Sequence, residues 1–128
     1  MKVKSIYLNL APKDLDKTRN FWSKLGFSFN ENLSSDKALC LILNDGAMYS
    51  MFIRQDYFNA FTNRHIADDY SSQMLIAIEV DSRERLDQII NLAIKNGGSR
   101  YKESKDYEWM YYDSFADPDG HKWELMFT

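Results

Sequence analysis

The sequence predicts an α+β fold built from two βαβββ modules. Stretches of alternating apolar and polar residues, typical of strands, stand in the same order around two amphipathic helices. This order returns after about 65 residues, which indicates an internal repeat. The chain has 128 residues, a length that suits one domain. We therefore expect a single domain made of two modules, residues 1–66 and 67–128.

The first module begins with the stretch 3–10, which alternates so that Tyr7 and Asn9 share one face of a strand. Asp14 stands where a helix N-cap belongs, and Gly26 ends the helix. The apolar stripe of this helix is expected to cover the opposite face of the sheet. Turn residues separate the following predicted elements: strands at 27–32, 38–43 and 47–54, then a short helix with a crossover over 55–71.

The second module repeats the pattern with a strand at 74–80 and a helix that Asp81 caps and Asn96-Gly97 closes. Further strands are predicted at 99–103, 108–115 and 121–127. Alternation places Trp109 and Tyr111 on one face and Tyr112 on the other, and it leaves open which face lines a cavity.

Composition excludes several classes of function. The 16 Lys and Arg residues against 19 Asp and Glu residues give a net charge of −3, without the basic patch that nucleic-acid binding needs. No apolar stretch is long enough to span a bilayer, so we expect no membrane partner. The absence of a signal-peptide pattern and the single unpaired cysteine, Cys40, favour the cytoplasm.

Two segments carry a resemblance to a known family. Asp117-Pro118-Asp119-Gly120 is a tight turn followed by His121-Lys122-Trp123-Glu124-Leu125, near the end of a doubled βαβββ chain. The segment from Leu10 to Phe27, with its Pro12-Lys13-Asp14 start and Phe21-Trp22 pair, matches the corresponding opening pattern. Together they resemble the vicinal-oxygen-chelate superfamily, which includes glyoxalase I, extradiol dioxygenases, fosfomycin-resistance enzymes and bleomycin-resistance proteins.

The resemblance implies that the strands curl into a cupped mixed sheet with the helices on its outer face. The cup would hold the active site, and two chains would pair as a homodimer. Whether the two modules close on each other within one chain or between chains stays open.

The resemblance also implies four metal-ligand positions, which fall on Tyr7, Met51, Leu75 and Glu124. Metal-dependent members need histidine and glutamate there, because imidazole and carboxylate bind divalent ions. A phenol, a thioether and an alkyl side chain are poor ligands for such ions. Neither histidine of the chain, His65 or His121, falls on a ligand position. We therefore expect no metal and no other cofactor.

Glu124 is the one matching position and the candidate catalytic residue, since a carboxylate inside an apolar cavity can serve as a general acid or base. The alternative is a structural role, with a hydrogen bond to Tyr7 or Asn9. The residues expected to line a ligand site are Tyr7, Asn9, Tyr49, Met51, Leu75, Trp109, Tyr111 and Tyr112. The aromatic residues among them could instead pack the core and a dimer interface.

These observations favour a metal-independent protein, akin to the bleomycin-resistance branch, that binds a small aromatic or apolar molecule. The alternative is a glyoxalase-type lyase, or another small-molecule enzyme, that uses Glu124 as acid and base. An interaction module with a purely structural cup is the third hypothesis.

Overall fold

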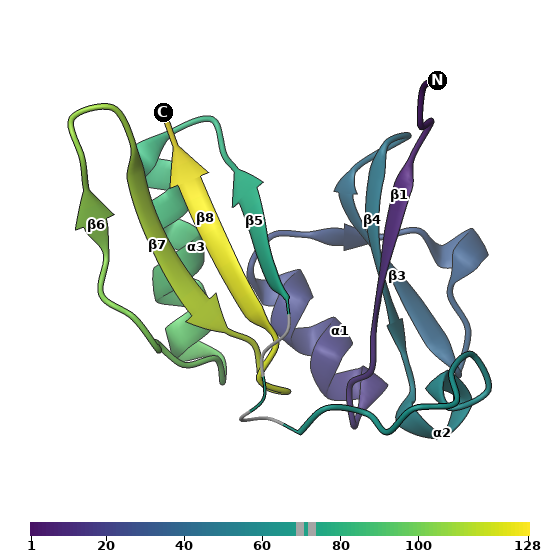
Figure 1. Ribbon diagram of the computed structural model, residues 1–128. Coiled ribbons are helices and arrows are strands. Elements are labelled where there is room, and N and C mark those ends of the chain that lie inside the picture. Colours follow the sequence, from purple (N-terminus) through teal and green to yellow (C-terminus); the bar gives the residue numbers. More distant parts are fainter. Residues whose placement is uncertain (69–70, 72–73) are drawn as a thin grey trace. The chain divides into compact units, whose positions relative to one another are not determined.

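The structure, a computed structural model, describes residues 1–68, 71 and 74–128. It divides into two compact units, Met1–Ile66 and Ala67–Thr128. Each unit holds one four-stranded mixed sheet and a long helix that packs on it (Figure 1).

The first unit contains seven elements in its described chain: β1 (Ile6–Leu10), α1 (Leu15–Lys24), β2 (Ser28–Phe29), the 3-10 helix η1 (Glu31–Leu33), β3 (Ala38–Asn44), β4 (Met48–Ile53) and α2 (Gln55–Phe58). Its sheet has the strand order β1-β4-β3-β2. β1 pairs with β4 in parallel, and the other neighbours are antiparallel.

The second unit has the same plan, with β5 (Leu75–Glu79), α3 (Arg83–Lys95), β6 (Lys105–Asp106), β7 (Tyr111–Ala116) and β8 (Lys122–Phe127). The strand order is β5-β8-β7-β6, and β5 pairs with β8 in parallel. The element order and the matching sheets confirm the predicted α+β class and the two βαβββ modules. In the described parts of the chain, no helix is long and apolar enough to cross a membrane.

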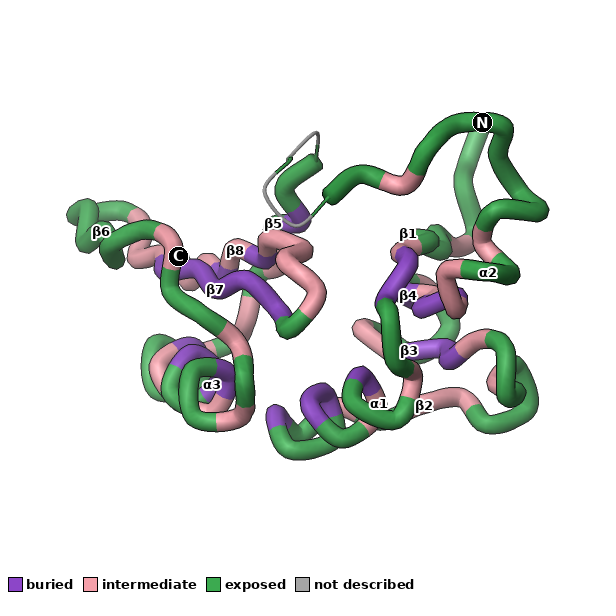
Figure 2. Tube along the Cα trace, turned by 90° about the horizontal axis from the view of Figure 1, so that it is seen from below, coloured by how far each residue is buried: buried purple, intermediate pink, exposed green. Residues whose placement is uncertain are grey.

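One face of each sheet is covered by its own helix. α1 packs on β3 and β4, and the ring of Trp22 lies 5.8 Å from that of Phe52. α3 packs on β7 and β8, where Phe115, Trp123 and Leu125 are at most 1% exposed. The buried parts of both helices face their own strands (Figure 2). The opposite side of each sheet, which its helix does not cover, is called the open face below.

The helix ends follow local capping chemistry. Asp14 is the N-cap of α1, as predicted, and its carboxylate accepts hydrogen bonds from the backbone N–H groups of residues 16 and 17. Gly26 has a φ of +96°, which favours glycine, directly after this helix. The prediction for α3 was wrong by one residue, because the hydroxyl of Ser82, and not the carboxylate of Asp81, accepts from the N–H of Arg85.

Two predicted strands are much shorter than expected. The strand predicted at 27–32 ends at Phe29, because the Asn30 side chain accepts the N–H of Asn32 and starts the turn of η1. The strand predicted at 99–103 is reduced to one bridge between Ser99 and Ala116. Pairing resumes only at β6. The helix predicted within 55–71 is α2, and residues 69–70 of that prediction lie outside the described residues.

The turn before β8 is organised by one buried carboxylate. Asp117, which is 4% exposed, accepts hydrogen bonds from the backbone N–H groups of Asp119 and His121. Its second oxygen lies 2.9 Å from His121 Nδ1 and accepts from Trp123 Nε1 at 3.2 Å. Gly120 closes the turn with a φ of +87°. This network fixes where β8 starts and therefore which of its side chains lie on the open face.

Candidate functional site

The strand register places the four positions Tyr7, Met51, Leu75 and Glu124 on the open faces. Met51 is the partner of Asn9 across β1 and β4, and Tyr7 lies two residues before Asn9 on the same face. Glu124 is the partner of Ala77 across β5 and β8, and Leu75 lies two residues before Ala77. The two pairs are therefore equivalent positions of the repeated unit, each on the face that the helix leaves uncovered.

The open face of the first sheet carries a pair of stacked tyrosines. The rings of Tyr7 and Tyr49 lie 4.8 Å apart at an angle of 12°. The Tyr49 hydroxyl accepts from the N–H of Gly46 and donates to Asp45 Oδ1 at 3.0 Å, so it is held by the β3–β4 turn. Tyr49 is 6% exposed, whereas Tyr7 is 45% exposed and presents its ring to solvent. The pair is thus a fixed aromatic platform.

The environment of the Tyr49 hydroxyl keeps it protonated. The hydrogen bond from Gly46 lowers the pKa of Tyr49, but burial and the Asp45 carboxylate outweigh this effect and raise it above its usual value. Tyr49 therefore contributes a neutral ring to the open face.

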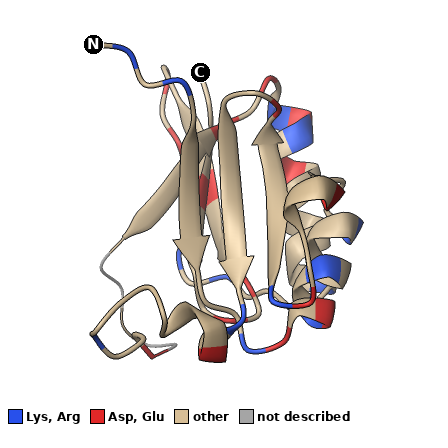
Figure 3. Cartoon of the chain, turned by 90° about the vertical axis from the view of Figure 1, so that its right-hand side faces the viewer, with Lys and Arg blue, Asp and Glu red and all other residues tan. Residues whose placement is uncertain are grey.

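The rest of this face is uncharged. The strands of the first sheet contain no Lys, Arg, Asp or Glu, and these residues lie on the helices and loops instead (Figure 3). Asn9 is exposed and supplies an amide, and Met51 is half-buried beside it. Cys40 is the register partner of Met51 and is fully buried, and this burial raises the pKa of its thiol. The sequence-based interpretation of Cys40 as a buried apolar residue is confirmed.

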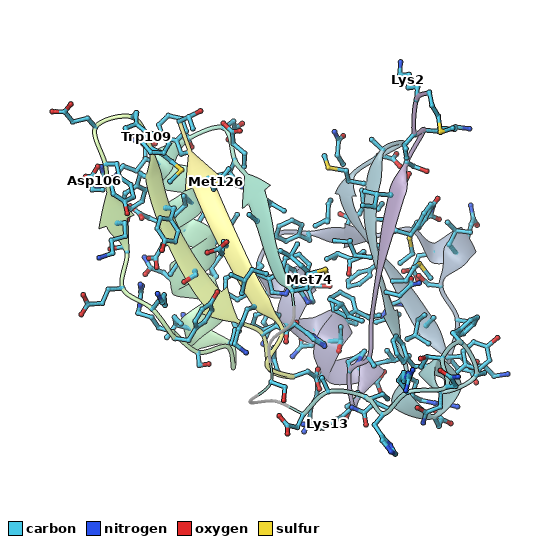
Figure 4. The ribbon with its side chains drawn as sticks, viewed as in Figure 1. Lys2, Lys13, Met74, Asp106, Trp109 and Met126 are labelled. Carbon is cyan, nitrogen blue, oxygen red and sulfur yellow. The ribbon has the colours of Figure 1, made fainter. Side chains whose placement is uncertain are left out.

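The open face of the second sheet combines apolar and charged side chains. Leu75 is 53% exposed at the edge strand, and Tyr112, Glu124 and Met126 are half-buried on the strands beside it. Met126 is labelled on β8 in Figure 4. Within the described residues, the Glu124 carboxylate makes no hydrogen bond and no ion pair.

Two residues near Glu124 were not among the predicted site residues. Ser114 is the register partner of Glu124 across β7 and β8 and is 1% exposed. Tyr101 lies close enough to both for their groups to affect its ionisation. The register of the Ser99–Ala116 bridge, continued by two residues, sets Tyr101 opposite Ser114. The alternation along β7 would have revealed Ser114, but Tyr101 depends on a short loop that the pattern does not define.

Two other predicted residues lie away from the open faces. Tyr111 is on the helix side of β7, where its hydroxyl donates to Asp87 on α3 and its ring lies 3.9 Å from the guanidinium carbon of Arg83. Trp109 is at the turn between β6 and β7, as labelled in Figure 4, where it is 70% exposed and stacks on Tyr107. Of Trp109, Tyr111 and Tyr112, only Tyr112 faces the same side of the second sheet as Glu124.

A family model matches residues 4–125 of the chain, and it describes the Glyoxalase/Bleomycin resistance protein/Dioxygenase superfamily. The chain belongs to this superfamily. A hypothetical protein from S. aureus superposes with a TM-score of 0.83 at 25% identity, over 100% of this chain and 96% of that one. Among curated proteins, no sequence matches.

Two more distant structures share the superfamily fold. The fosfomycin resistance protein FosX from Listeria monocytogenes has a TM-score of 0.72 at 17% identity and covers 100% of this chain and 95% of that one. A bleomycin-binding protein in complex with bleomycin has a TM-score of 0.68 at 20% identity and covers 98% and 99%. At such identities the likeness establishes the fold and not the ligand.

The residues present do not fit the divalent metal that the superfamily resemblance implies. Of its four ligand positions, only Glu124 carries a group that binds such ions well. The described residues contain no group of three or more His, Cys, Asp or Glu side chains placed to hold a metal. Of the two histidines, His121 is the nearer in sequence to Glu124, and its ring faces the Asp117 carboxylate in the turn. The side chains at three of the four positions, Tyr7, Met51 and Leu75, are therefore poor ligands for such an ion.

Proposed function

We propose that this superfamily member binds a small aromatic or apolar molecule on the open faces of its sheets, without a metal. The stacked pair of Tyr7 and Tyr49 carries this proposal. A stacked pair in which the Tyr49 ring is held by the β3–β4 turn and the Tyr7 ring is exposed offers a flat apolar surface at little entropic cost. Asn9 and Met51 beside it add one amide and one adaptable apolar side chain. The bleomycin-binding protein, with a similar fold, supports a small-molecule ligand.

The proposal includes a homodimer in the cytoplasm. The superfamily resemblance supports the dimer, and light scattering on the purified protein measures it directly. The unpaired, buried Cys40 supports a reducing compartment.

A thermal-shift experiment with aromatic metabolites and antibiotics, including bleomycin, tests the function with and without Zn²⁺, Ni²⁺, Mn²⁺ or Fe²⁺. We expect an aromatic compound to raise the melting temperature without any metal. A ligand at about 100 times its dissociation constant stabilises the folded state by about 2.7 kcal/mol, which such a scan detects easily. Stabilisation by a divalent metal alone at near-stoichiometric concentration would contradict the proposal and favour a metal-dependent enzyme.

Two tyrosines of nearly equal exposure provide the matched variants. Tyr7 is 45% and Tyr107 is 46% exposed, but only Tyr7 belongs to the platform. Tyr7→Ala should remove most of the ligand-induced shift, whereas Tyr107→Ala should keep it. Equal shifts in both variants would show that the ligand binds elsewhere.

A second candidate function is a glyoxalase-type lyase, or another small-molecule enzyme, in which Glu124 moves a proton. The observation that favours it is the Glu124 carboxylate, which lies near the Tyr101 hydroxyl and has no ion-pair partner among the described side chains. A carboxylate in this setting can accept a proton from a bound substrate. Glu124→Gln keeps the shape of the side chain and one acceptor oxygen, but it replaces the other oxygen by an amide donor and removes the basicity. If the wild-type protein turns over a substrate and this variant does so equally fast, Glu124 is not the acid–base group.

A further inference from the structure

Two buried hydroxyl groups on the second sheet have no hydrogen-bond partner among the described residues: Tyr101 Oη and Ser114 Oγ. They lie beside each other without the alignment of a hydrogen bond. A buried hydroxyl without a partner costs roughly 1–3 kcal/mol, so such pairs are rare in folded proteins and call for an explanation.

The charges around the two hydroxyls are balanced. Glu124 contributes a carboxylate from β8, and Lys122 on the same strand holds its ammonium 5.8 Å from the Tyr101 ring. The Lys122 ammonium also donates to the carbonyl oxygen of Gly120 at 3.0 Å. The other charged groups on this face are farther along the strands: Glu79, which accepts from the Thr128 hydroxyl, and Lys105, which is exposed on β6.

The Tyr101 hydroxyl stays protonated and can donate. Burial raises the pKa of Tyr101, the Ser114 hydroxyl opposes this shift, and the Glu124 carboxylate adds to it. The ionised Glu124 carboxylate, in contrast, can only accept hydrogen bonds.

We propose that Tyr101, Ser114 and Glu124 together bind a neutral ligand group that both accepts and donates hydrogen bonds, namely a hydroxyl or a primary carboxamide on an apolar ring. This inference rests on the proposed binding of small aromatic or apolar molecules and names a polar group of such a molecule that the second sheet recognises. The group accepts from Tyr101 and donates to Glu124, and Ser114 completes either role. Both hydroxyl oxygens are buried, so the proposal requires the side chains that cover them to move aside when the ligand enters.

Other ligand groups match these residues less well. A carboxylate meets the negative charge of Glu124, and a protonated amine meets the ammonium of Lys122. A methyl group or an ether leaves the Glu124 carboxylate without a donor. Only a neutral donor–acceptor group satisfies the two hydroxyls and the carboxylate together.

The test compares naphthalene probes that share one ring system and differ in one group: 2-naphthol, 2-methylnaphthalene, 2-naphthoate and 2-naphthylmethylammonium. Dissociation constants come from NMR titrations of the whole chain, followed at the backbone amides of β1 and β4, which carry the Tyr7–Tyr49 pair, and of β7 and β8. We expect 2-naphthol to bind about fivefold more tightly than 2-methylnaphthalene, because one net hydrogen bond contributes about 1 kcal/mol. The Lys122 amide resonance should move when 2-naphthol binds.

Variants assign this preference to the hydroxyls. Tyr101→Phe and Ser114→Ala should each reduce the preference for 2-naphthol and leave the affinity for 2-methylnaphthalene unchanged. Tyr107→Phe removes a hydroxyl from the exposed turn and should keep the full preference. If Tyr101→Phe keeps it too, or if either charged probe binds more tightly than 2-naphthol, the inference is wrong.

The failures of the two proposals are distinguishable. If 2-methylnaphthalene and 2-naphthol bind the wild-type protein equally well, the apolar site stands and the polar inference is overturned. If none of the probes binds, the proposed binding of flat apolar molecules fails, and the inference fails with it.

Discussion

Asp117 should be the most sensitive carboxylate of the second unit, and Asp117→Ala tests this. Its two oxygens serve four N–H groups: two from the backbone of the turn, the His121 ring and the Trp123 indole. The residue is 4% exposed and Trp123 is fully buried. Removing the carboxylate therefore takes the acceptor from donors that hold the turn and the start of β8 together.

The expected decrease in the free energy of unfolding of Asp117→Ala follows from these contacts. Each hydrogen bond contributes about 1 kcal/mol net, so four bonds give an upper value of about 4 kcal/mol. The half-exposed turn regains part of this from water. The buried indole N–H does not, so we expect a loss of roughly 3 kcal/mol. Domains of this size are stable by about 5–15 kcal/mol, so the variant should still fold.

Urea unfolding followed by tryptophan fluorescence measures this loss. The matched control is Asp106→Ala, which removes a carboxylate from an ion pair with Arg83 in which both side chains are more than half exposed. Exposed ion pairs contribute about 0–1 kcal/mol, so the control should change little. If Asp117→Ala loses no more stability than Asp106→Ala, the reasoning about the turn is refuted.

Two further predictions concern pKa shifts. Burial raises the pKa of Tyr101 and of Tyr111, so the folded chain keeps these protons at a pH where the unfolded chain loses them. The contribution of these two groups to the free energy of unfolding should therefore be fully present below about pH 10 and should fall above it. Urea midpoints measured across this range check this, and Tyr101→Phe should show a shallower fall. Burial also raises the pKa of the Cys40 thiol, so Ellman's reagent should react slowly with the folded protein and fast in urea, and a fast reaction without urea would contradict the burial.

Except for Tyr111, the faces of the predicted site residues on regular strands followed from the sequence. Tyr7 and Asn9 share a face because side chains alternate along a strand, and their partners Tyr49 and Met51 lie on the same face because paired residues point the same way. The apolar stripe of α1 then decides which face is covered. These are local rules, and the register obeys them.

The region before β7 did not follow from the sequence. Ser99 pairs with Ala116, and Lys105 pairs with Tyr112. The chain therefore advances six residues from Ser99 to Lys105, whereas the paired part of β7 advances only four, from Tyr112 to Ala116. The extra residues form an irregular loop, and no hydrophobic pattern specifies where such a loop interrupts a strand. Tyr101 lies in it, which is why the pattern missed this residue, whose ionisation Glu124 affects. The N-cap of α3 was misplaced for a related reason: Asp81 and Ser82 are both good caps, and the exit of the chain from β5 decides between them.

The two modules share one architecture but differ in the chemistry of their open faces. In the first, the positions of Tyr7 and Met51 lie on strands without any charged residue. In the second, the equivalent positions hold Leu75 and Glu124, and the strand of Glu124 also carries Lys122. The helix side of both sheets is constrained by packing, so the open face is where the repeats were free to diverge. The proposed recognition of an apolar ring therefore rests on the first face, and the proposed recognition of a polar group or transfer of a proton rests on the second.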